Sequence, residues 1–186
     1  MQEVGRKETL PALRGLVHVY TGDGKGKTTA ALGCALRALG WGFRVCVIQF
    51  IKGYSEIGEA KFAKDFGDRF TVRQFAVDLC RSMDEAKVLQ RKRSAEEAMA
   101  FAEQVIFNGD CELVVLDEIN NAMHYGLIDI QRVLKLIKSK PASVELILTG
   151  RNAPPDIMEA ADYVTEMQLI KHPFQKGIPA RKGIDY

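Results

Sequence analysis

The sequence has few of the residues that build metal or disulfide frameworks, and it has no long apolar run. Its 4 cysteines and 3 histidines are dispersed over 186 residues, with no Cys-x-x-Cys pair. This spacing argues against a structural zinc site and against a disulfide scaffold. No stretch reaches the roughly 18 apolar residues of a membrane span, and the segment 1–14 lacks the apolar core of a secretory signal. Scattered thiols in such a chain indicate a cytoplasmic protein.

The sequence also lacks a large excess of positive or negative charge. The net charge is +2 with an isoelectric point near 8.3, which does not by itself predict a nucleic-acid partner. The one dense basic run, at 90–94, is explained as the solvated face of a helix. With 47% hydrophobic and 27% charged residues, the chain is expected to form one globular domain over 15–186, preceded by a polar segment.

Strand and helix patterns alternate along the chain. Strands are predicted at 15–20, 43–51, 69–75, 111–119, 143–150 and 162–170, and helices at 28–39, 55–67, 83–107, 128–140 and 154–161. Ser55 is a candidate N-cap of the second helix. Nearly continuous apolar strands are typical of a sheet buried on both faces. The order predicts an α/β fold: a mostly parallel sheet with helices on both faces, as in the three-layer sandwich of RecA-like P-loop NTPases.

The stretch HVYTGDGKGKTTAALG, from His18 to Gly33, is the strongest local signal. A Walker A motif reads G-x-x-x-x-G-K-[ST], and counting back from Gly26 the first glycine should stand where Thr21 is found. The loop nevertheless follows a strand and opens a helix, so its N–H groups and the helix N-terminus favour phosphate. The expected nucleotide-binding residues of this loop are Gly22, Asp23, Gly24, Lys25, Gly26, Lys27, Thr28 and Thr29.

A second motif, LVVLDE, ends a buried strand in Asp117 and Glu118 and resembles a Walker B element. We expect Lys27 and Glu118 to be catalytic and Thr28 and Glu118 to bind Mg²⁺ or Mn²⁺. Asp117 is expected to support the metal side without accepting a proton. Because ligands bind beyond the carboxyl ends of parallel strands, the glycine loop, this acidic pair and the TGRNAPP stretch are predicted to meet at one sheet edge.

With these residues assembled, the chain resembles the P-loop-type ATP:corrinoid adenosyltransferases. The resemblance covers about Gly15 to Tyr186 and is carried by TGDGKGKTTAALG, VIQFIKG, VVLDEINNAMHYGLID, LTGRNAPPDIMEAADYVTEM and KHPFQKGIPARKGIDY. It implies transfer of the 5′-deoxyadenosyl group of ATP to Co(I) of a corrinoid, with release of triphosphate, in adenosylcobalamin biosynthesis or salvage. It also implies that ATP lies in reversed sense in the loop and that Arg37 contacts the nucleotide.

The same resemblance implies partners beyond the two substrates. These are a second copy of the chain, whose segment 1–14 would reach over the partner's nucleotide, and an electron donor such as a flavodoxin-type protein. No nucleic acid or membrane partner is expected. Two positions depart from the family pattern: Asp23 stands where asparagine is usual, and the usual Phe-x-Trp segment is replaced by FAVDLCRSMDE at 75–85. Phe75, Leu79 and Met83 either fill that role or belong to the core.

Two other classes of protein could carry the same glycine loop. A RecA-like ATPase or small-molecule kinase would release ADP, and a regulatory module would bind ATP without turnover. No arginine-rich lid and no residue that would hold a nucleophile can be identified in the sequence, which fits an attack by the substrate's own Co(I). The products of the reaction therefore distinguish the three hypotheses.

Overall fold

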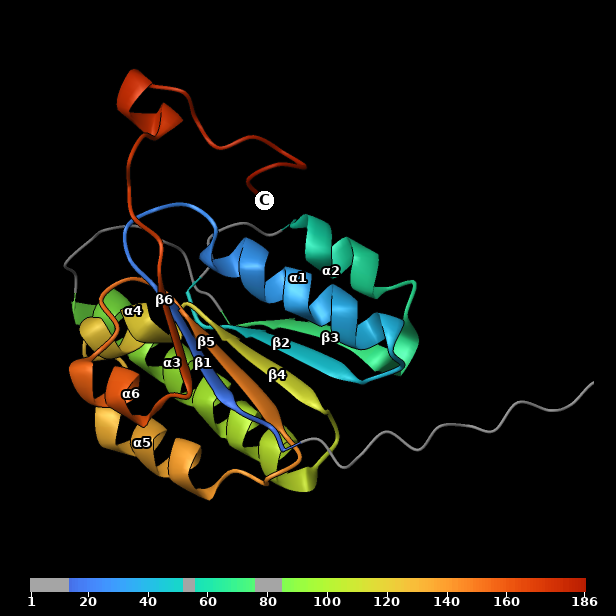
Figure 1. Cartoon of the computed structure of the whole chain (residues 1–186). Coiled ribbons are helices and arrows are strands. Elements are labelled where there is room, and N and C mark those ends of the chain that lie inside the picture. Colours follow the sequence, from blue (N-terminus) through green and yellow to red (C-terminus); the bar gives the residue numbers. More distant parts are fainter. Residues whose placement is uncertain (1–13, 52–55, 76–84) are drawn as a thin grey trace, which may run out of the picture.

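The computed structural model describes residues 14–51, 56–75 and 85–186, and their strands form one sheet (Figure 1). The strand order is β3-β2-β4-β5-β1-β6, and every neighbouring pair is parallel. The strands are β1 Val17–Thr21, β2 Val45–Gln49, β3 Phe70–Gln74, β4 Leu113–Asp117, β5 Glu145–Thr149 and β6 Tyr163–Glu166. The glycine-loop strand β1 and the acidic strand β4 are thus separated by β5.

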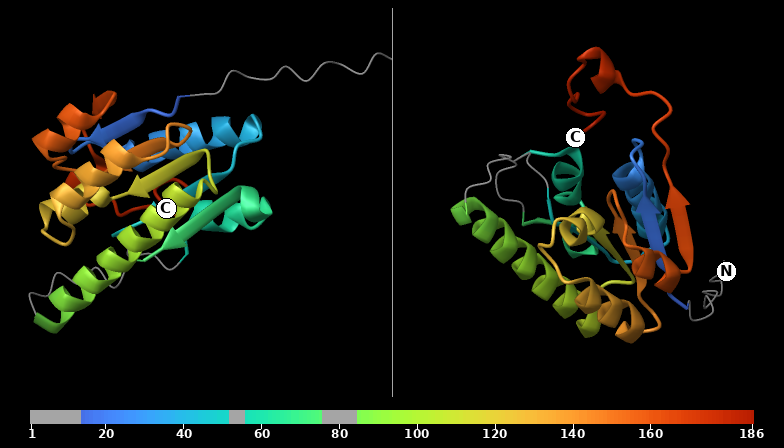
Figure 2. Two further views of the ribbon diagram at one scale, coloured as in Figure 1. Left: turned by 90° about the horizontal axis from the view of Figure 1, so that it is seen from below. Right: turned by 90° about the vertical axis from the view of Figure 1, so that its left-hand side faces the viewer.

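The helices cover both faces of this sheet, as predicted. They are α1 Lys27–Gly40, α2 Gly58–Ala63, α3 Glu85–Asn108, α4 Ile119–His124, α5 Ile130–Ser139 and α6 Pro155–Ala160, with 3₁₀ turns η1 Gly67–Arg69 and η2 Pro173–Lys176. Figures 1 and 2 show α1 and α2 on one face and α3, α4, α5 and α6 on the other. This three-layer arrangement confirms the predicted fold class. No helix in the described ranges is long and apolar enough to cross a membrane.

Each central strand supplies side chains to two separate cores. On β2, Val45 and Val47 pack on the α1 side, whereas Cys46 and Ile48 pack on the α3 side, and all four are buried. Successive side chains of a strand point to opposite faces, so a strand covered on both faces must be apolar throughout. The continuous apolar run seen in the sequence is the direct consequence.

Several predicted boundaries need correction. The strand expected over 111–119 ends at Asp117, because Glu118 has a positive φ of 66° and turns the chain into α4, a helix that the prediction missed. The helix expected over 55–67 is present only as α2, and Ser55 lies outside the described residues. The last strand is β6 alone, shorter than the predicted 162–170. The long helix agrees closely, as α3.

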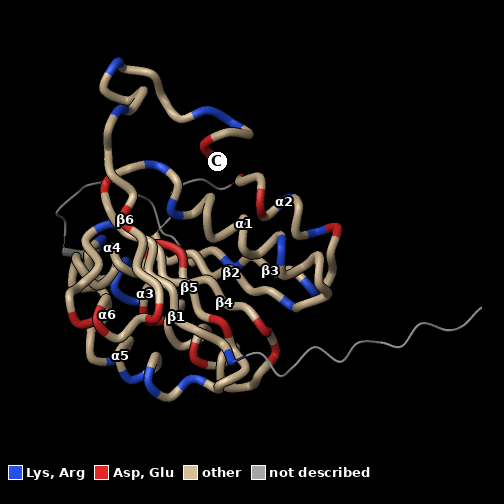
Figure 3. The backbone as a smooth tube through the Cα atoms, in the orientation of Figure 1, with Lys and Arg blue, Asp and Glu red and all other residues tan. Residues whose placement is uncertain are grey.

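The chain after β6 leaves the sheet and arches over the α1 face. Figures 1 and 2 show this C-terminal segment returning so that the C-terminus lies beside α1 and α2. Figure 3 shows basic residues both along this arch and on the loop that opens α1, with an acidic residue near the C-terminus. The expected segment 1–14 lies outside the described residues apart from Arg14.

Candidate functional site

Lys27, the first residue of α1, turns back into the glycine loop. Its Nζ donates to the carbonyl oxygens of Gly22 and Gly24, each at 2.7 Å. The residue is only 9% exposed, and burial, followed by the nearby positive charge of Arg151, lowers the pKa of its ammonium group. A desolvated cation is stabilised by an anion, and it lies here beside the loop and the helix N-terminus. The arrangement therefore favours a phosphate ligand.

The glycines are required by the close approach of the chain that continues β6. Gly24 N–H donates to the carbonyl oxygen of Met167 at 2.6 Å. A Cβ added at Gly22 would lie 2.5 Å from that same oxygen, and one at Gly24 would lie 2.5 Å from Gln168 O. Gly22 and Gly26 also have positive φ values of 89° and 129°. The shortened loop is thus pressed against Met167, and any side chain at these positions would separate the two segments.

Asp117 joins the ends of three neighbouring strands to the start of α1. Its Oδ1 accepts hydrogen bonds from Thr28 Oγ1 at 2.8 Å and from Thr149 Oγ1 at 2.7 Å. Its Oδ2 accepts one from Gln49 Nε2 at 3.2 Å, and the aspartate is fully buried. The carboxyl ends of β2, β4 and β5 therefore meet at this carboxylate. The Thr28 hydroxyl, predicted to share a metal with Glu118, contacts Asp117.

Glu118 follows immediately, in a backbone conformation that disfavours any side chain. Its φ of 66° and ψ of 17° lie in the left-handed region, which costs roughly 1–2 kcal/mol for a residue with a Cβ. Its N–H donates to Thr149 Oγ1 at 3.0 Å, which holds the turn in place. Strain of this kind concentrates at functional sites. The turn places Glu118 in the wall of the cleft described below.

Arg151, in the TGRNAPP stretch, is a candidate site residue to which the sequence alone assigned no role. It follows β5, and its Nη2 donates to Asp23 O at 3.3 Å while its Nε lies 3.5 Å from Asp23 Oδ1. Its backbone N–H donates to Asn121 Oδ1 at 2.6 Å. A Cβ at Gly150 would lie 2.5 Å from that amide oxygen, so this glycine allows the approach. A second cation is thereby placed next to Lys27.

These residues border an open cleft of about 970 Å³. It lies between the glycine loop, α1 and α2 on one side and the C-terminal segment on the other. The lining includes Asp23, Gly24, Lys25, Gly26, Lys27, Thr28, Thr29, Leu32, Leu36, Phe62, Glu118, Arg151, Phe174, Ile178 and Tyr186. Of the predicted site residues, Gly22, Arg37 and the supporting Asp117 are not in its wall, and all the others are. Arg37 is exposed on α1, and its charge acts on Tyr20 of β1.

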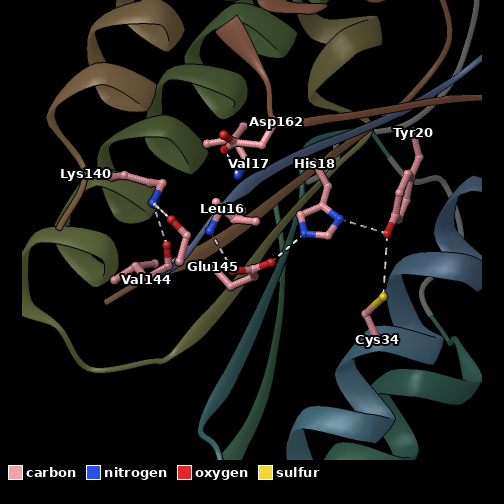
Figure 4. Close-up of polar contacts among 10 residues, drawn as sticks. Leu16, Val17, His18, Tyr20, Cys34, Lys140, Val144, Glu145 and Asp162 are labelled. Carbon is pink, nitrogen blue, oxygen red and sulfur yellow. Dashed lines mark hydrogen bonds and ion pairs between the residues drawn. The ribbon is translucent and has the colours of Figure 1, made fainter. Parts of the chain in front are cut away.

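A second polar cluster lies outside this cleft (Figure 4). His18 Nε2 on β1 lies 2.5 Å from Glu145 Oε1 on β5, and the Tyr20 hydroxyl lies 3.3 Å from His18 Nδ1. The same hydroxyl lies 3.5 Å from Cys34 Sγ on α1. Burial, then Cys34, raises the pKa of Tyr20. The cluster links β5, β1 and α1, and we assign it to the packing of the strand that carries the glycine loop.

The donor set near the loop suits a hard cation with few protein ligands. Within the described ranges, no three His, Cys, Asp or Glu side chains gather in a ligand cage. A hydroxyl and a carboxylate do meet, at Thr28 and Asp117, beside Glu118. Mg²⁺ is commonly held by one or two such groups together with waters and phosphate oxygens of the substrate. The residues present therefore fit Mg²⁺.

Comparison with known proteins agrees with this geometry. The family model described as ATP:corrinoid adenosyltransferase BtuR/CobO/CobP matches residues 13–186. The chain belongs to this family. It is 40% identical over 174 residues to a corrinoid adenosyltransferase of Pseudomonas aeruginosa, covering 93% of this chain and 84% of that one. A corrinoid adenosyltransferase of Sinorhizobium is 41% identical, with 93% and 81% covered.

The chain is also similar to a more distant enzyme and to a solved structure. The corrinoid adenosyltransferase CobA of Salmonella typhimurium is 35% identical over 178 residues, covering 93% of this chain and 86% of that one. A KaiC-like protein of Pyrococcus horikoshii has a TM-score of 0.48 at 18% identity, with 84% and 73% of the two chains covered. The family assignment confirms the resemblance seen in the sequence. In the stretch 75–85 that replaces the Phe-x-Trp segment, Phe75 packs against the core on the α3 side, next to Phe101. Residues 76–84, with Leu79 and Met83, lie outside the described ranges.

Proposed function

We propose that this chain transfers the 5′-deoxyadenosyl group of ATP to Co(I) of a corrinoid and releases inorganic triphosphate. The observation that carries the proposal is the meeting of Lys27, Arg151 and the Thr28–Asp117 pair around one shortened loop. This loop belongs to a chain that matches the ATP:corrinoid adenosyltransferase family over residues 13–186. ATP and a reduced corrinoid are then the two substrates.

In this reaction the electron pair of the substrate's Co(I) forms the new cobalt–carbon bond at C5′. The C5′–O bond breaks, and its electrons leave on the triphosphate. The protein therefore has to hold the two substrates in line and stabilise the negative charge of the leaving group. Lys27, Arg151 and the N-terminus of α1 are positioned for the second task. No side chain has to accept a proton.

We propose that Thr28, Asp117 and Glu118 hold Mg²⁺, or Mn²⁺, when nucleotide binds. The cation would neutralise part of the triphosphate charge. The reversed placement of ATP and the contact of Arg37 with the nucleotide are proposed from family resemblance. What supports an unusual placement is the loop itself. Its Gly24 N–H donates to Met167 O, in the chain that continues β6, and so is already used within the protein.

We further propose, from the same resemblance, that the protein works as a homodimer in the cytoplasm. Segment 1–14 would cover the partner's nucleotide, and a flavodoxin-type protein would supply electrons for Co(I). Light scattering at micromolar concentration, with and without segment 1–14, tests the dimer. A fully active monomer would contradict it.

The products test the reaction itself. Incubation with chemically reduced cobalamin, ATP and Mg²⁺ should yield adenosylcobalamin and intact triphosphate in equal amounts, followed by cobalt–carbon absorbance and phosphorus NMR. ADP and phosphate without alkylated cobalt would favour the ATPase or kinase. Binding of ATP without any product would favour the regulatory module.

A further inference from the structure

The last part of the chain, residues 171–186, is called the tail below. It forms the outer wall of the cleft opposite the glycine loop. Its apolar side chains there include Phe174, Ile178 and Ile184, which are 76%, 46% and 63% exposed. Across the cleft, Leu32, Leu36 and Phe62 extend the apolar lining on α1 and α2. The cleft therefore has a cationic floor at the loop and an apolar mouth to which the tail contributes.

Lys25 connects the tail to the glycine loop. Its Nζ lies 2.7 Å from Asp185 Oδ1 and donates to Ile184 O at 3.4 Å. The other carboxylate oxygen, Asp185 Oδ2, accepts from Arg181 N at 2.9 Å and from Arg181 Nε at 3.1 Å. One carboxylate thus closes the turn at the end of the tail and also joins it to the loop. The Lys25 hydrogen bond and these Arg181 contacts hold the pKa of Asp185 well below its usual range.

The two lysines of the loop have different surroundings. Lys27 is buried and bonded to loop carbonyls, whereas the Lys25 side chain is 45% exposed and reaches outward to Asp185. We infer that Lys25 is a positioning residue: it holds the tail across the cleft as the wall for the corrinoid, and it is not a ligand of the phosphates. This inference rests on the proposed function. Because the phosphates of ATP are assigned to the basic residues at the glycine loop, the larger and amphiphilic corrinoid would contact the apolar residues at the opening of the cleft.

Steady-state kinetics separate this role from phosphate binding. Lys25→Ala and Asp185→Asn should each raise KM for the corrinoid about two- to fivefold, the size expected for one exposed ion pair. KM for ATP and kcat should stay at the wild-type values. The double variant should be no worse than Asp185→Asn alone, because the loss of the Asp185 charge already weakens the Lys25 contact together with the Arg181 contacts. Lys25→Arg keeps the positive charge and should retain the wild-type KM for the corrinoid. Lys176→Ala, which removes an exposed lysine of the same tail, serves as the control.

Hydrogen exchange gives a readout that does not depend on catalysis. The amides of Gly183, Ile184 and Asp185 donate within the terminal turn, so they should exchange faster in Lys25→Ala and Asp185→Asn than in the wild type or the control. A rise in KM for ATP in Lys25→Ala but not in Asp185→Asn would show a phosphate ligand and overturn the inference. Additive effects in the double variant, or unchanged exchange, would also overturn it. An inactive wild type with faster exchange in the variants would refute the proposed function but leave the tail contact standing.

Discussion

Asp117 is the residue at which a single substitution best separates folding from chemistry. Asp117→Asn keeps the size of the side chain and removes its charge. The amide oxygen can still accept from Thr28 and Thr149, if it takes the place of Oδ1. The amide nitrogen then faces Gln49 Nε2, also a donor, so one buried hydrogen bond is lost. We expect the free energy of unfolding to fall by about 1–2 kcal/mol.

Asp117→Ala is the harsher comparison. It leaves the hydroxyl of Thr149 and the amide of Gln49, both fully buried, without this acceptor. At about 1–3 kcal/mol for each of these two buried donors, the loss of stability should be roughly 2–6 kcal/mol, toward the lower end because Gln49 Nε2 keeps Glu59 Oε1 as an acceptor. Typical domains have 5–15 kcal/mol, so a weakened fold is expected to persist. Urea denaturation followed by circular dichroism measures both losses.

Turnover should behave differently from stability. If the Asp117 carboxylate supports the metal beside Thr28, both variants should lose about 10²-fold or more in kcat, although their stabilities differ. The assay is adenosylcobalamin formation from Co(I) at saturating ATP and Mg²⁺, at a temperature at which both variants are folded. Turnover of Asp117→Asn within tenfold of the wild type would refute a role for the charge. Asp117 would then be a structural acceptor only.

Three further predictions test other parts of the site and the fold. Lys27→Ala should lose about 2–4 kcal/mol of transition-state stabilisation, measured as kcat/KM; near-normal turnover would remove Lys27 from the site. Glu118→Gly should keep the free energy of unfolding within about 1 kcal/mol, since relief of the positive φ offsets the added chain entropy, yet lower turnover about tenfold or more; equal activity would make Glu118 dispensable. Arg132 donates to both oxygens of Glu103, at 2.8 Å and 2.7 Å, which lowers the pKa of that glutamate, and it also donates to Glu96; Arg132→Met removes both pairs and should cost about 1 kcal/mol at pH 7. The Arg132–Glu103 stabilisation is present above the ordinary glutamate pKa and is lost as pH falls through the lowered value, so urea midpoints of wild type and variant should converge in acid; a constant difference would contradict the ion pair.

Local signals in the sequence placed the glycine loop between a strand and a helix, and the acidic pair at a strand end, as the structure has them. A glycine loop between an apolar strand and a helix is a contiguous pattern, and so is an apolar run that ends in two acids. The sequence could not show which acid contacts Thr28. That depends on β4 ending in register with Gln49 of β2 and next to Thr149 of β5, and on the positive φ that turns the chain at Glu118. The register follows from the order of the strands, which neighbouring residues in the sequence do not encode.

Arg151 was missed for a related reason. Its side chain reaches Asp23 only because Gly150 lets the chain pass within contact of Asn121. Gly150 permits that approach, but the sequence does not show that Asn121, 30 residues earlier, is the partner. Arg37 gave the opposite result: the resemblance implied a nucleotide contact, whereas the residue lies outside the cleft wall. Its contact with nucleotide stays a prediction.

The short loop and the distinctive C-terminal part of the chain are parts of one structural unit. Without the residue that a Walker A motif would add, the loop lies against Met167, whose carbonyl accepts the Gly24 N–H and approaches the Cβ position of Gly22. The chain beyond Met167 then rises from the sheet edge into the tail, which returns to the same loop through Lys25 and Asp185. The C-terminal segment therefore contacts the loop twice, at its start through Met167 and near its end through Asp185. A longer loop would displace Met167 and with it the start of the tail, so the glycine spacing and the C-terminal sequence have to change together.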